Sequence, residues 1–280
     1  MASDRYEDSD VEASGNRVAV VTGASRGVGR GVALGLGEAG FIVYLTGRTI
    51  HDGDSDRPGS VTKTAAEVAD LGGHGIAVAC DHRSELDTEA VFDRVNREQG
   101  RLDVVVNNAT SYTTDIGPPE EAPFWELPTD IWDQMHTVGL RSHYVASRFA
   151  AQQMVAQGRG LIVNISSIGA TRYTGNVSYN VVKAGVDMLT LASAEELRPR
   201  GVAVVSVWPR LTRTEGVLAH PELFPEPDKA WSPQFAGRAV AALAADPNVL
   251  DKTGRAFDIG DLAAEYGFTD IDGRRPAPRS

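Results

Sequence analysis

Cysteine is nearly absent from this chain of 280 residues, in which Cys80 stands alone. A single thiol excludes a framework of intrachain disulfides and is consistent with a reducing compartment. The six histidines show no spacing typical of a metal site, so we expect no bound metal and expect them to be surface or packing residues. No apolar run reaches the roughly 18–20 residues that cross a bilayer, and the sequence therefore predicts no membrane span.

Basic residues are outnumbered by acidic ones, 27 against 38, which gives a formal net charge of −11. This balance argues against nucleic-acid binding, because attraction to phosphates needs a basic face. Residues 1–15 are acidic and polar, unlike a signal peptide, and are expected to form a disordered lead-in. Together these features predict a cytoplasmic protein.

The chain does contain a regular alternation of apolar runs and amphipathic stretches. The runs are apolar throughout, which is typical of strands in a sheet that is covered on both faces. Intervening helices of ten or more residues make such a sheet parallel. We predict one Rossmann-type α/β domain over residues 16–262, a doubly wound, seven-stranded parallel sheet with helices on both faces, followed by a C-terminal extension over residues 263–280. The expected strands cover about residues 17–22, 41–47, 75–81, 102–109, 160–167, 202–209 and 255–259, and the expected helices follow the first strand up to residue 40 and cover about residues 61–71, 85–98, 129–156, 177–197 and 233–245.

Glycines cluster where the first expected strand meets the first helix, in TGASRGVGRG (22–31). Gly23, Gly27 and Gly29 allow a sharp turn and a close approach of the backbone to a pyrophosphate at the helix N-terminus. The strand-to-helix context is the one that a dinucleotide-binding loop requires. No Lys-Ser or Lys-Thr follows the glycines, which excludes a Walker-type loop. The alternative is a purely structural glycine turn.

The residues after the second expected strand indicate which nucleotide binds. NAD-binding proteins carry an acid there that holds the ribose 2′-hydroxyl. This chain has Gly47 and Arg48 instead, and Arg26 of the glycine loop supplies a second cation. Two guanidinium groups suit a 2′-phosphate, so the sequence predicts a preference for NADP(H), with NAD(H) possible. The long loop over residues 49–60 carries charges that can modify this preference, namely Asp52, Asp54, Asp56 and Arg57.

The segment SYNVVKAG (178–185) places Tyr179 four residues before Lys183. On a helix this spacing puts both side chains on one face. An ammonium group beside a phenol favours the phenolate, which a general acid/base needs near neutral pH. Because the chain has seven tyrosines and four lysines, such a pair arises by chance with a probability of roughly one in ten. The pair alone is weak evidence for a catalytic site, and the surrounding sequence must show whether it is one.

The motifs and their order resemble the short-chain dehydrogenase/reductase family. TGASRGVG fits its glycine loop, Cys80–Asp81 its adenine-contacting position, NNA (107–109) its fourth-strand motif and YNVVK its catalytic pair. The match covers about residues 17–259. Within the family, the sequence is most similar to the subgroup named dehydrogenase/reductase family member 1, through VTGASRGVGRGVAL, GRLDVVVNNA, FWELPTDIWD, VGLRSHY and DLAAEYGFTDIDGR.

The resemblance implies a catalytic set of Ser167, Tyr179 and Lys183. Ser167 would hydrogen-bond the substrate carbonyl oxygen, Tyr179 would act as general acid/base, and Lys183 would also bind the nicotinamide ribose. Ser166 is rejected, because the family motif places the active serine second in the pair. Tyr173 is interpreted as a pocket-wall or packing residue. The cofactor contacts implied by the resemblance are Gly23, Ser25, Arg26, Gly27, Val28, Gly29, Arg48, Asp81, Asn108, Ala109, Tyr179, Lys183, Pro209 and Thr214.

Three positions depart from the family pattern. Gly139 replaces a helical asparagine that supports a water relay to the lysine, with Thr137 and His136 as conceivable substitutes. Arg210 replaces a glycine after the sixth strand, and Thr110 stands where glycine is common. The departures at Gly139 and Arg210 are the basis for a hypothesis that the chain binds NADP without turnover.

Two irregular segments, residues 111–127 and 211–232, are expected to form the substrate mouth at the carboxyl ends of the strands, the second being the family's mobile substrate loop. Their apolar side chains favour a lipophilic ketone or aldehyde. These side chains are Tyr112, Phe124, Trp125, Leu218, Phe224 and Trp231.

The leading hypothesis is therefore an NADP(H)-dependent oxidoreductase that interconverts a lipophilic ketone or aldehyde and its alcohol. The alternatives are an enoyl-thioester reductase and a catalytically impaired NADP-binding sensor or scaffold. The resemblance also implies a homodimer or homotetramer, paired through the helices over residues 129–156 and 177–197.

Overall fold

The structure, a computed structural model, describes residues 16–111, 123–220, 222 and 227–276. Within this part of the chain, one sheet of seven parallel strands has the order β3-β2-β1-β4-β5-β6-β7. This confirms the predicted doubly wound fold. The strands are β1 (Val18–Thr22), β2 (Ile42–Gly47), β3 (His74–Ala79), β4 (Val104–Asn107), β5 (Gly160–Ile165), β6 (Val202–Trp208) and β7 (Ala256–Asp258).

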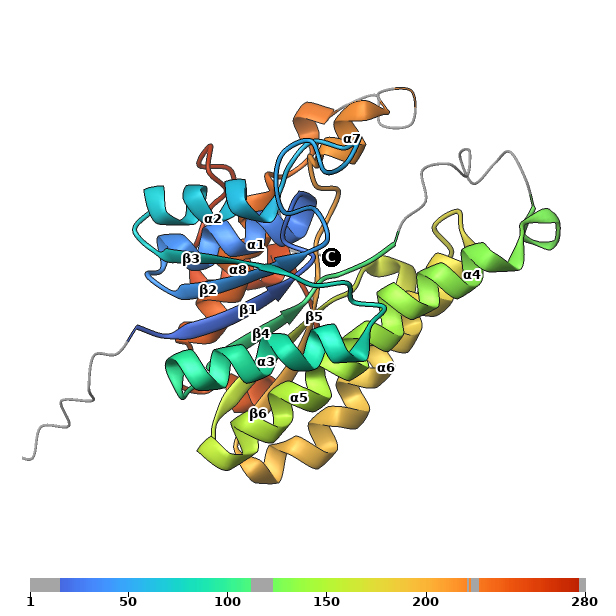
Figure 1. Cartoon of the computed structure of the whole chain (residues 1–280). Helices are drawn as coiled ribbons and strands as arrows, with labels where there is room; N and C mark the ends of the chain where they lie inside the picture. Colours follow the sequence, from blue (N-terminus) through green and yellow to red (C-terminus); the bar gives the residue numbers. More distant parts are fainter. Residues whose placement is uncertain (1–15, 112–122, 221, 223–226, 277–280) are drawn as a thin grey trace, which may run out of the picture.

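Helices cover both faces of the sheet (Figure 1), with α1, α2 and α8 on one side and α3, α5 and α6 on the other. Several begin at a capping side chain, and Asn176 caps α6 by accepting a hydrogen bond from the Tyr179 backbone N–H at 2.8 Å. The described α-helices are α1 (Gly27–Glu38), α2 (Val61–Asp70), α3 (Glu85–Gln99), α4 (Thr129–His136), α5 (Ser142–Gln157), α6 (Val177–Leu197), α7 (Glu215–Ala219), α8 (Pro233–Ala245) and α9 (Ile259–Tyr266).

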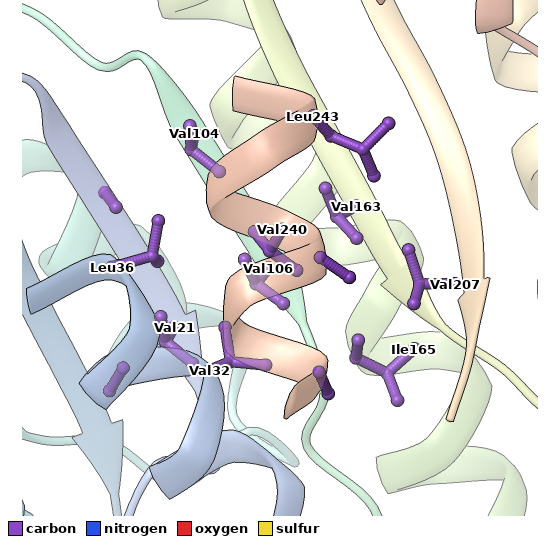
Figure 2. Packing of buried hydrophobic residues seen from close by; sticks show 14 of the residues in the cluster. Val21, Val32, Leu36, Val104, Val106, Val163, Ile165, Val207, Val240 and Leu243 are labelled. Carbon is purple, nitrogen blue, oxygen red and sulfur yellow. The ribbon is translucent and has the colours of Figure 1, made fainter. Parts of the chain in front are cut away.

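The core lies on both sides of the sheet, because alternate residues of each strand point to opposite faces. Val21 packs toward α1 and α8, whereas its neighbour Val20 packs toward α3 and α5. Figure 2 shows the first of these layers, in which valines of four adjacent strands lie beneath the two helices. Helices α1 and α8 approach backbone to backbone, since a Cβ on Gly35 would lie 2.4 Å from the Gly237 carbonyl carbon. This contact holds α1 against α8 over one face of the sheet.

The main differences from the sequence prediction lie beyond the strands. The long helix expected over residues 129–156 is divided by a π-helical segment, Thr137–Arg141, between α4 and α5. Helices α7 and α9 were not predicted. The described part of the C-terminal extension is packed and not free, because the buried Asp270 carboxylate accepts a hydrogen bond from the Ser232 backbone N–H at 2.8 Å. The expected lead-in, residues 1–15, lies outside the described residues. None of the described helices combines the length and the apolar character that a bilayer crossing requires.

Candidate active site

The predicted site residues gather where the chain reverses its direction of winding, between β1 and β4. Ligands of open α/β sheets bind in this crevice. The strand ends are joined there, because the Thr22 hydroxyl accepts hydrogen bonds from the backbone N–H groups of Asn108 and Ala109 at 2.9 and 3.0 Å. The Asn108 amide in turn donates to the carbonyl oxygens of Thr22 and Gly23. Asn108 and Ala109 are therefore fixed at the edge of the expected cofactor site.

The glycine loop leaves no room for a side chain at Gly23 or Gly29. A Cβ on Gly29 would lie 2.3 Å from the Gly23 carbonyl oxygen, and one on Gly23 would lie 2.9 Å from the Ala109 Cα. Gly23 and Gly27 also have φ values of 66° and 60°, in the left-handed region that glycine tolerates best. The loop brings its backbone, followed by Val28, to the start of α1. This is the arrangement that a phosphate-binding turn needs.

Arg26 of the same loop is directed to the long connection after β2. Its Nη2 donates to the Thr49 hydroxyl and to the carbonyl oxygens of Arg57 and Gly59, at 3.2, 3.2 and 3.0 Å. Burial lowers the pKa of Arg26, and the positive charges of Arg57 and Arg48 lower it further. Arg26 thus fastens the 49–60 loop to the glycine loop, whereas Arg48 is exposed.

The other residues predicted to hold the nucleotide line the same edge. A Cβ on Gly47 would lie 3.9 Å from the Ser25 hydroxyl oxygen, so Ser25 lies against the end of β2. Asp81 follows β3 and forms a two-pronged ion pair with Arg83, which lowers the pKa of the Asp81 carboxyl group. Pro209 follows the last residue of β6.

Lys183 and Tyr179 share one face of α6, as their spacing predicted. The Lys183 ammonium is buried, donates to the Ile165 carbonyl oxygen at 2.9 Å and lies 5.6 Å from the centroid of the Tyr179 ring. Burial lowers the pKa of Lys183 to about 8, and the negative charge of Asp187 opposes this decrease. The structure therefore places an ammonium group beside the phenol at the end of β5.

Ser167 and Tyr179 meet around Gly169. A Cβ on Gly169 would lie 2.9 Å from the Ser167 Oγ and 3.0 Å from the Tyr179 Cε1. Sequence reasoning missed Asn180, which holds this segment in place: its amide donates to the carbonyl oxygens of Gly169 and Arg172. The three predicted catalytic residues are thus brought to one corner of the crevice.

Ser166, rejected from the catalytic set, is buried and its hydroxyl donates to the Lys183 carbonyl oxygen at 3.3 Å.

Sequence reasoning also missed Asp187, one helical turn beyond Lys183. Burial raises the pKa of the Asp187 carboxyl group, while hydrogen bonds from Ser206, Ser166 and Trp208 lower it. Its i,i+4 spacing from Lys183 was a signal that could have identified it.

The departures at Gly139 and Thr110 are in contact. A Cβ on Gly139 would lie 3.0 Å from a methyl group of Val182 and 3.4 Å from the Thr110 hydroxyl oxygen. Because the space beside Gly139 is taken, an asparagine there would displace its neighbours. The two departures therefore lie side by side, with Val182 on α6 filling the rest of the space beside Gly139.

Arg210 has a structural role after β6. Its Nε donates to the Asp258 carboxylate at 2.8 Å, and its guanidinium occupies the space that a Cβ on Gly260 would need. The same carboxylate caps α9 by accepting from the Gly260 backbone N–H at 2.8 Å. The arginine that replaces the family's glycine thus ties the end of β6 to the start of α9.

Backbone hydrogen bonds join the two ends of the predicted substrate loop, residues 211–232. Trp231 donates from its backbone N–H to the Leu211 carbonyl oxygen at 2.9 Å and accepts from the Arg213 backbone N–H at 2.8 Å. The Trp231 ring packs on Phe235, with centroids 5.1 Å apart, and therefore faces the core. Thr214 caps α7 by accepting a hydrogen bond from the Val217 backbone N–H.

Exposed apolar side chains flank the expected substrate mouth. Phe124, Trp125 and Leu218 are all more than half exposed. Tyr173 is 70% exposed, which is compatible with a wall of the mouth and not with packing. Tyr112 and Phe224 lie outside the described residues. In the part of the chain that the structure describes, no group of three or more metal-ligating side chains is found.

Two histidines are buried close to the site. His143, on α5, hydrogen-bonds the Ala109 carbonyl oxygen at 3.2 Å, and its Nδ1 has no hydrogen-bond partner among the described residues. His82 contacts the Thr46 hydroxyl at 2.7 Å. Burial lowers the pKa of His143 to about 3 and that of His82 to about 4. Both imidazoles are therefore neutral at pH 7.

We predict that His143 makes the fold sensitive to acid. Its contribution to the free energy of unfolding is unchanged above its unfolded-state pKa of about 6.5 and becomes unfavourable as the pH falls toward 3. Each pH unit in this window costs at most about 1.4 kcal/mol, because the unfolded chain alone binds the proton. Urea unfolding of the wild type and His143→Gln at pH 7 and pH 5 should show a smaller loss of stability in the variant. His74→Gln, at the exposed first residue of β3, serves as the control, and equal losses in all three proteins would contradict the prediction.

Comparisons with known proteins agree with this geometry. Residues 17–221 match the family model described as short chain dehydrogenase. The chain is 45% identical to mouse dehydrogenase/reductase SDR family member 1 and 42% identical to the human protein, over 92% of this chain and 84% of each relative. Among solved structures, a putative NAD(P)-dependent gluconate 5-dehydrogenase from Beutenbergia cavernae, with bound NADP at low occupancy, superposes with a TM-score of 0.73 at 29% identity, covering 88% of this chain and 96% of that one. A metagenomic short-chain oxidoreductase in complex with NADP gives a TM-score of 0.67 at 31% identity, covering 83% and 92%. The fold, the gathered site residues and these similarities show that the chain belongs to the short-chain dehydrogenase/reductase family and is an oxidoreductase that acts on alcohol or carbonyl groups.

Proposed function

We propose that the protein is an NADP(H)-dependent oxidoreductase that interconverts a lipophilic ketone or aldehyde and its alcohol, with Tyr179 as general acid/base. The observation that carries the proposal is the buried Lys183 ammonium beside the Tyr179 ring, with Ser167 at the same corner. This is the arrangement that proton transfer to a carbonyl oxygen needs. Phe124, Trp125 and Leu218 support an apolar substrate, because their exposed side chains belong to the two segments predicted to form the substrate mouth.

The crevice suits a nicotinamide dinucleotide. Gly23 and Gly29 leave the backbone open to a pyrophosphate at the start of α1, and Asn108 and Ala109 line the adjoining edge. Arg48, exposed after β2, would bind a 2′-phosphate, and the presence of NADP in two structural relatives supports this role. The bound cofactor would exchange a hydride with the substrate carbon.

The protein's own residues would carry out the proton transfer that accompanies hydride exchange. The Tyr179 hydroxyl donates its proton to the carbonyl oxygen during reduction and takes a proton from the alcohol during oxidation. Ser167 donates a hydrogen bond to the same oxygen and orients it. The Lys183 ammonium favours the phenolate form of Tyr179, and Asp187 helps to keep Lys183 charged at neutral pH.

Loss of the phenol tests this mechanism. Tyr179→Phe should reduce kcat for a panel of aromatic and long-chain aldehydes and ketones by about 10²–10⁴-fold, because general acid/base catalysis supplies a factor of that size. NADPH affinity should change little. Tyr173→Phe, which removes an exposed hydroxyl nearby, is the matched control.

The same assay separates the alternatives. Turnover of enoyl thioesters and none of the carbonyl panel would favour an enoyl-thioester reductase. Tight NADPH binding with equally negligible turnover in the wild type and Tyr179→Phe would favour a sensor or scaffold.

The cofactor preference rests on Arg48. Fluorescence titration should show tighter binding of NADPH than of NADH by the wild type, and Arg48→Ala should weaken NADPH binding by about tenfold while leaving NADH binding nearly unchanged. Arg200→Ala, an exposed arginine at the amino end of β6, controls for the loss of one positive charge. A preference for NADH in the wild type would overturn the assignment.

We also propose a homodimer or homotetramer built on α5 and α6. These helices carry apolar side chains that are exposed in the isolated chain, namely Tyr144, Val181, Met188 and Leu191. Met188→Asp should therefore shift the protein toward monomers in light scattering. Leu86→Asp, at an exposed apolar position on α3, should not. A wild type that is already monomeric at micromolar concentration would exclude the proposal.

A further inference from the structure

The start of α1 is capped from a distant part of the chain. Its own N-cap residue, Arg26, makes no side-chain capping hydrogen bond, and the first turn contains no acid. The Gly27 backbone N–H instead donates to the Glu215 carboxylate at 2.8 Å, across 188 positions of sequence. Glu215 is the first residue of α7 and lies in the predicted substrate loop. Figure 1 shows α7 at the end of the molecule where the loop after β2 also lies.

The surroundings of this carboxylate are positive. A helix N-terminus carries a partial positive charge, and the negative charge of Glu215 acts on the guanidinium groups of Arg26 and Arg30, in both cases raising their pKa. The contact also brings Thr214 to the glycine loop, because its methyl group would lie 3.7 Å from a Cβ on Gly27. Glu215 thus takes a position that the same charges would make attractive to a phosphate.

Helix α7 lies at the surface. None of its residues is buried, and Leu218 is 53% exposed. The base of the loop is fixed separately by the hydrogen bonds between Trp231 and residues 211 and 213. A change at Glu215 can therefore move α7 without opening the hinge of the loop.

We infer that Glu215 is a displaceable anion at the start of α1 that competes with the dinucleotide pyrophosphate, so that nucleotide binding moves residues 214–219 of the substrate loop. This inference rests on the proposed nucleotide site. The Gly27 N–H cannot donate a full hydrogen bond to two acceptors at once, and two anions at one helix N-terminus repel each other. The arriving pyrophosphate therefore releases α7 beside the substrate mouth.

The inference is tested by measuring nucleotide affinity for the wild type, Glu215→Gln and Glu215→Ala. Both variants should bind NADPH and NADH about threefold to tenfold more tightly, because the competing charge is gone. ADP-ribose, which contains the pyrophosphate, should gain the same factor, whereas 2′-AMP, which lacks it, should gain nothing. Glu222→Gln removes an exposed carboxylate from the same loop and should bind all four compounds as the wild type does.

Each failure has its own meaning. A wild type that binds neither NADPH nor ADP-ribose would disprove the nucleotide site itself. Unchanged or weaker binding of ADP-ribose by both folded Glu215 variants, or an equal gain for 2′-AMP, would overturn the role of Glu215 while leaving the site intact.

Hydrogen exchange gives a second, independent readout. NADPH should accelerate exchange of the backbone amides of Val217 and Leu218 in the wild type, because both are held by Thr214 at the start of α7. In Glu215→Ala these amides should exchange fast with or without NADPH. Protection of α7 by NADPH in the wild type would contradict displacement.

Discussion

The buried ammonium of Lys183 is the constraint around which this side of the molecule is organised. A charge that leaves water needs compensation, and here the Ile165 carbonyl at the end of β5 and the Asp187 carboxylate one turn along α6 provide it. Asp187 requires partners in turn, which it finds in Ser166, Ser206 and Trp208. A polar layer consequently forms between α6 and the sheet, where an apolar core would otherwise be expected.

That layer continues across the sheet. The Ser206 hydroxyl contacts Thr190 at 2.8 Å, Thr190 accepts from Asn164, and Asn164 accepts from Asn107, whose amide also donates to Ser147 on α5. A connected network of this kind orients its members, although the buried Asn107 Oδ1 has no hydrogen-bond partner among the described residues. It connects α5, β4, β5, α6 and β6 beneath the carboxyl edge. The position of Tyr179 and Ser167 above this edge is therefore set by more than the local turn.

The fold followed from the sequence because apolar strand runs and the glycine turn are local signals. The paired positions of Tyr179 and Lys183 followed equally well, since i,i+4 spacing determines a shared helix face. The contact between Glu215 and Gly27 could not be predicted from the sequence, because it joins residues 188 positions apart and depends on how a loop folds back. The proximity of Thr110 to Gly139 could not be predicted for the same reason, and the π-helical segment at Gly139 has no recognised sequence signal. Helix α7, of five residues, is too short to show a helical period.

The three departures from the family pattern weigh differently once their contacts are known. Arg210 joins the end of β6 to the start of α9, and Gly139 and Thr110 lie side by side, so none of them removes a member of the Ser167–Tyr179–Lys183 corner. The buried charge of Lys183 also bears on whether the protein is a catalyst. Its pKa of about 8 against an ordinary 10.5 means that its burial costs on the order of 3 kcal/mol of stability at neutral pH, fully present below pH 8 and relieved as the pH rises toward 10.5. An apolar residue at this position would avoid that cost. The buried charge beside Tyr179 is therefore consistent with the proposed roles of Lys183 in catalysis and in binding the nicotinamide ribose, because functional sites are where folds give up stability.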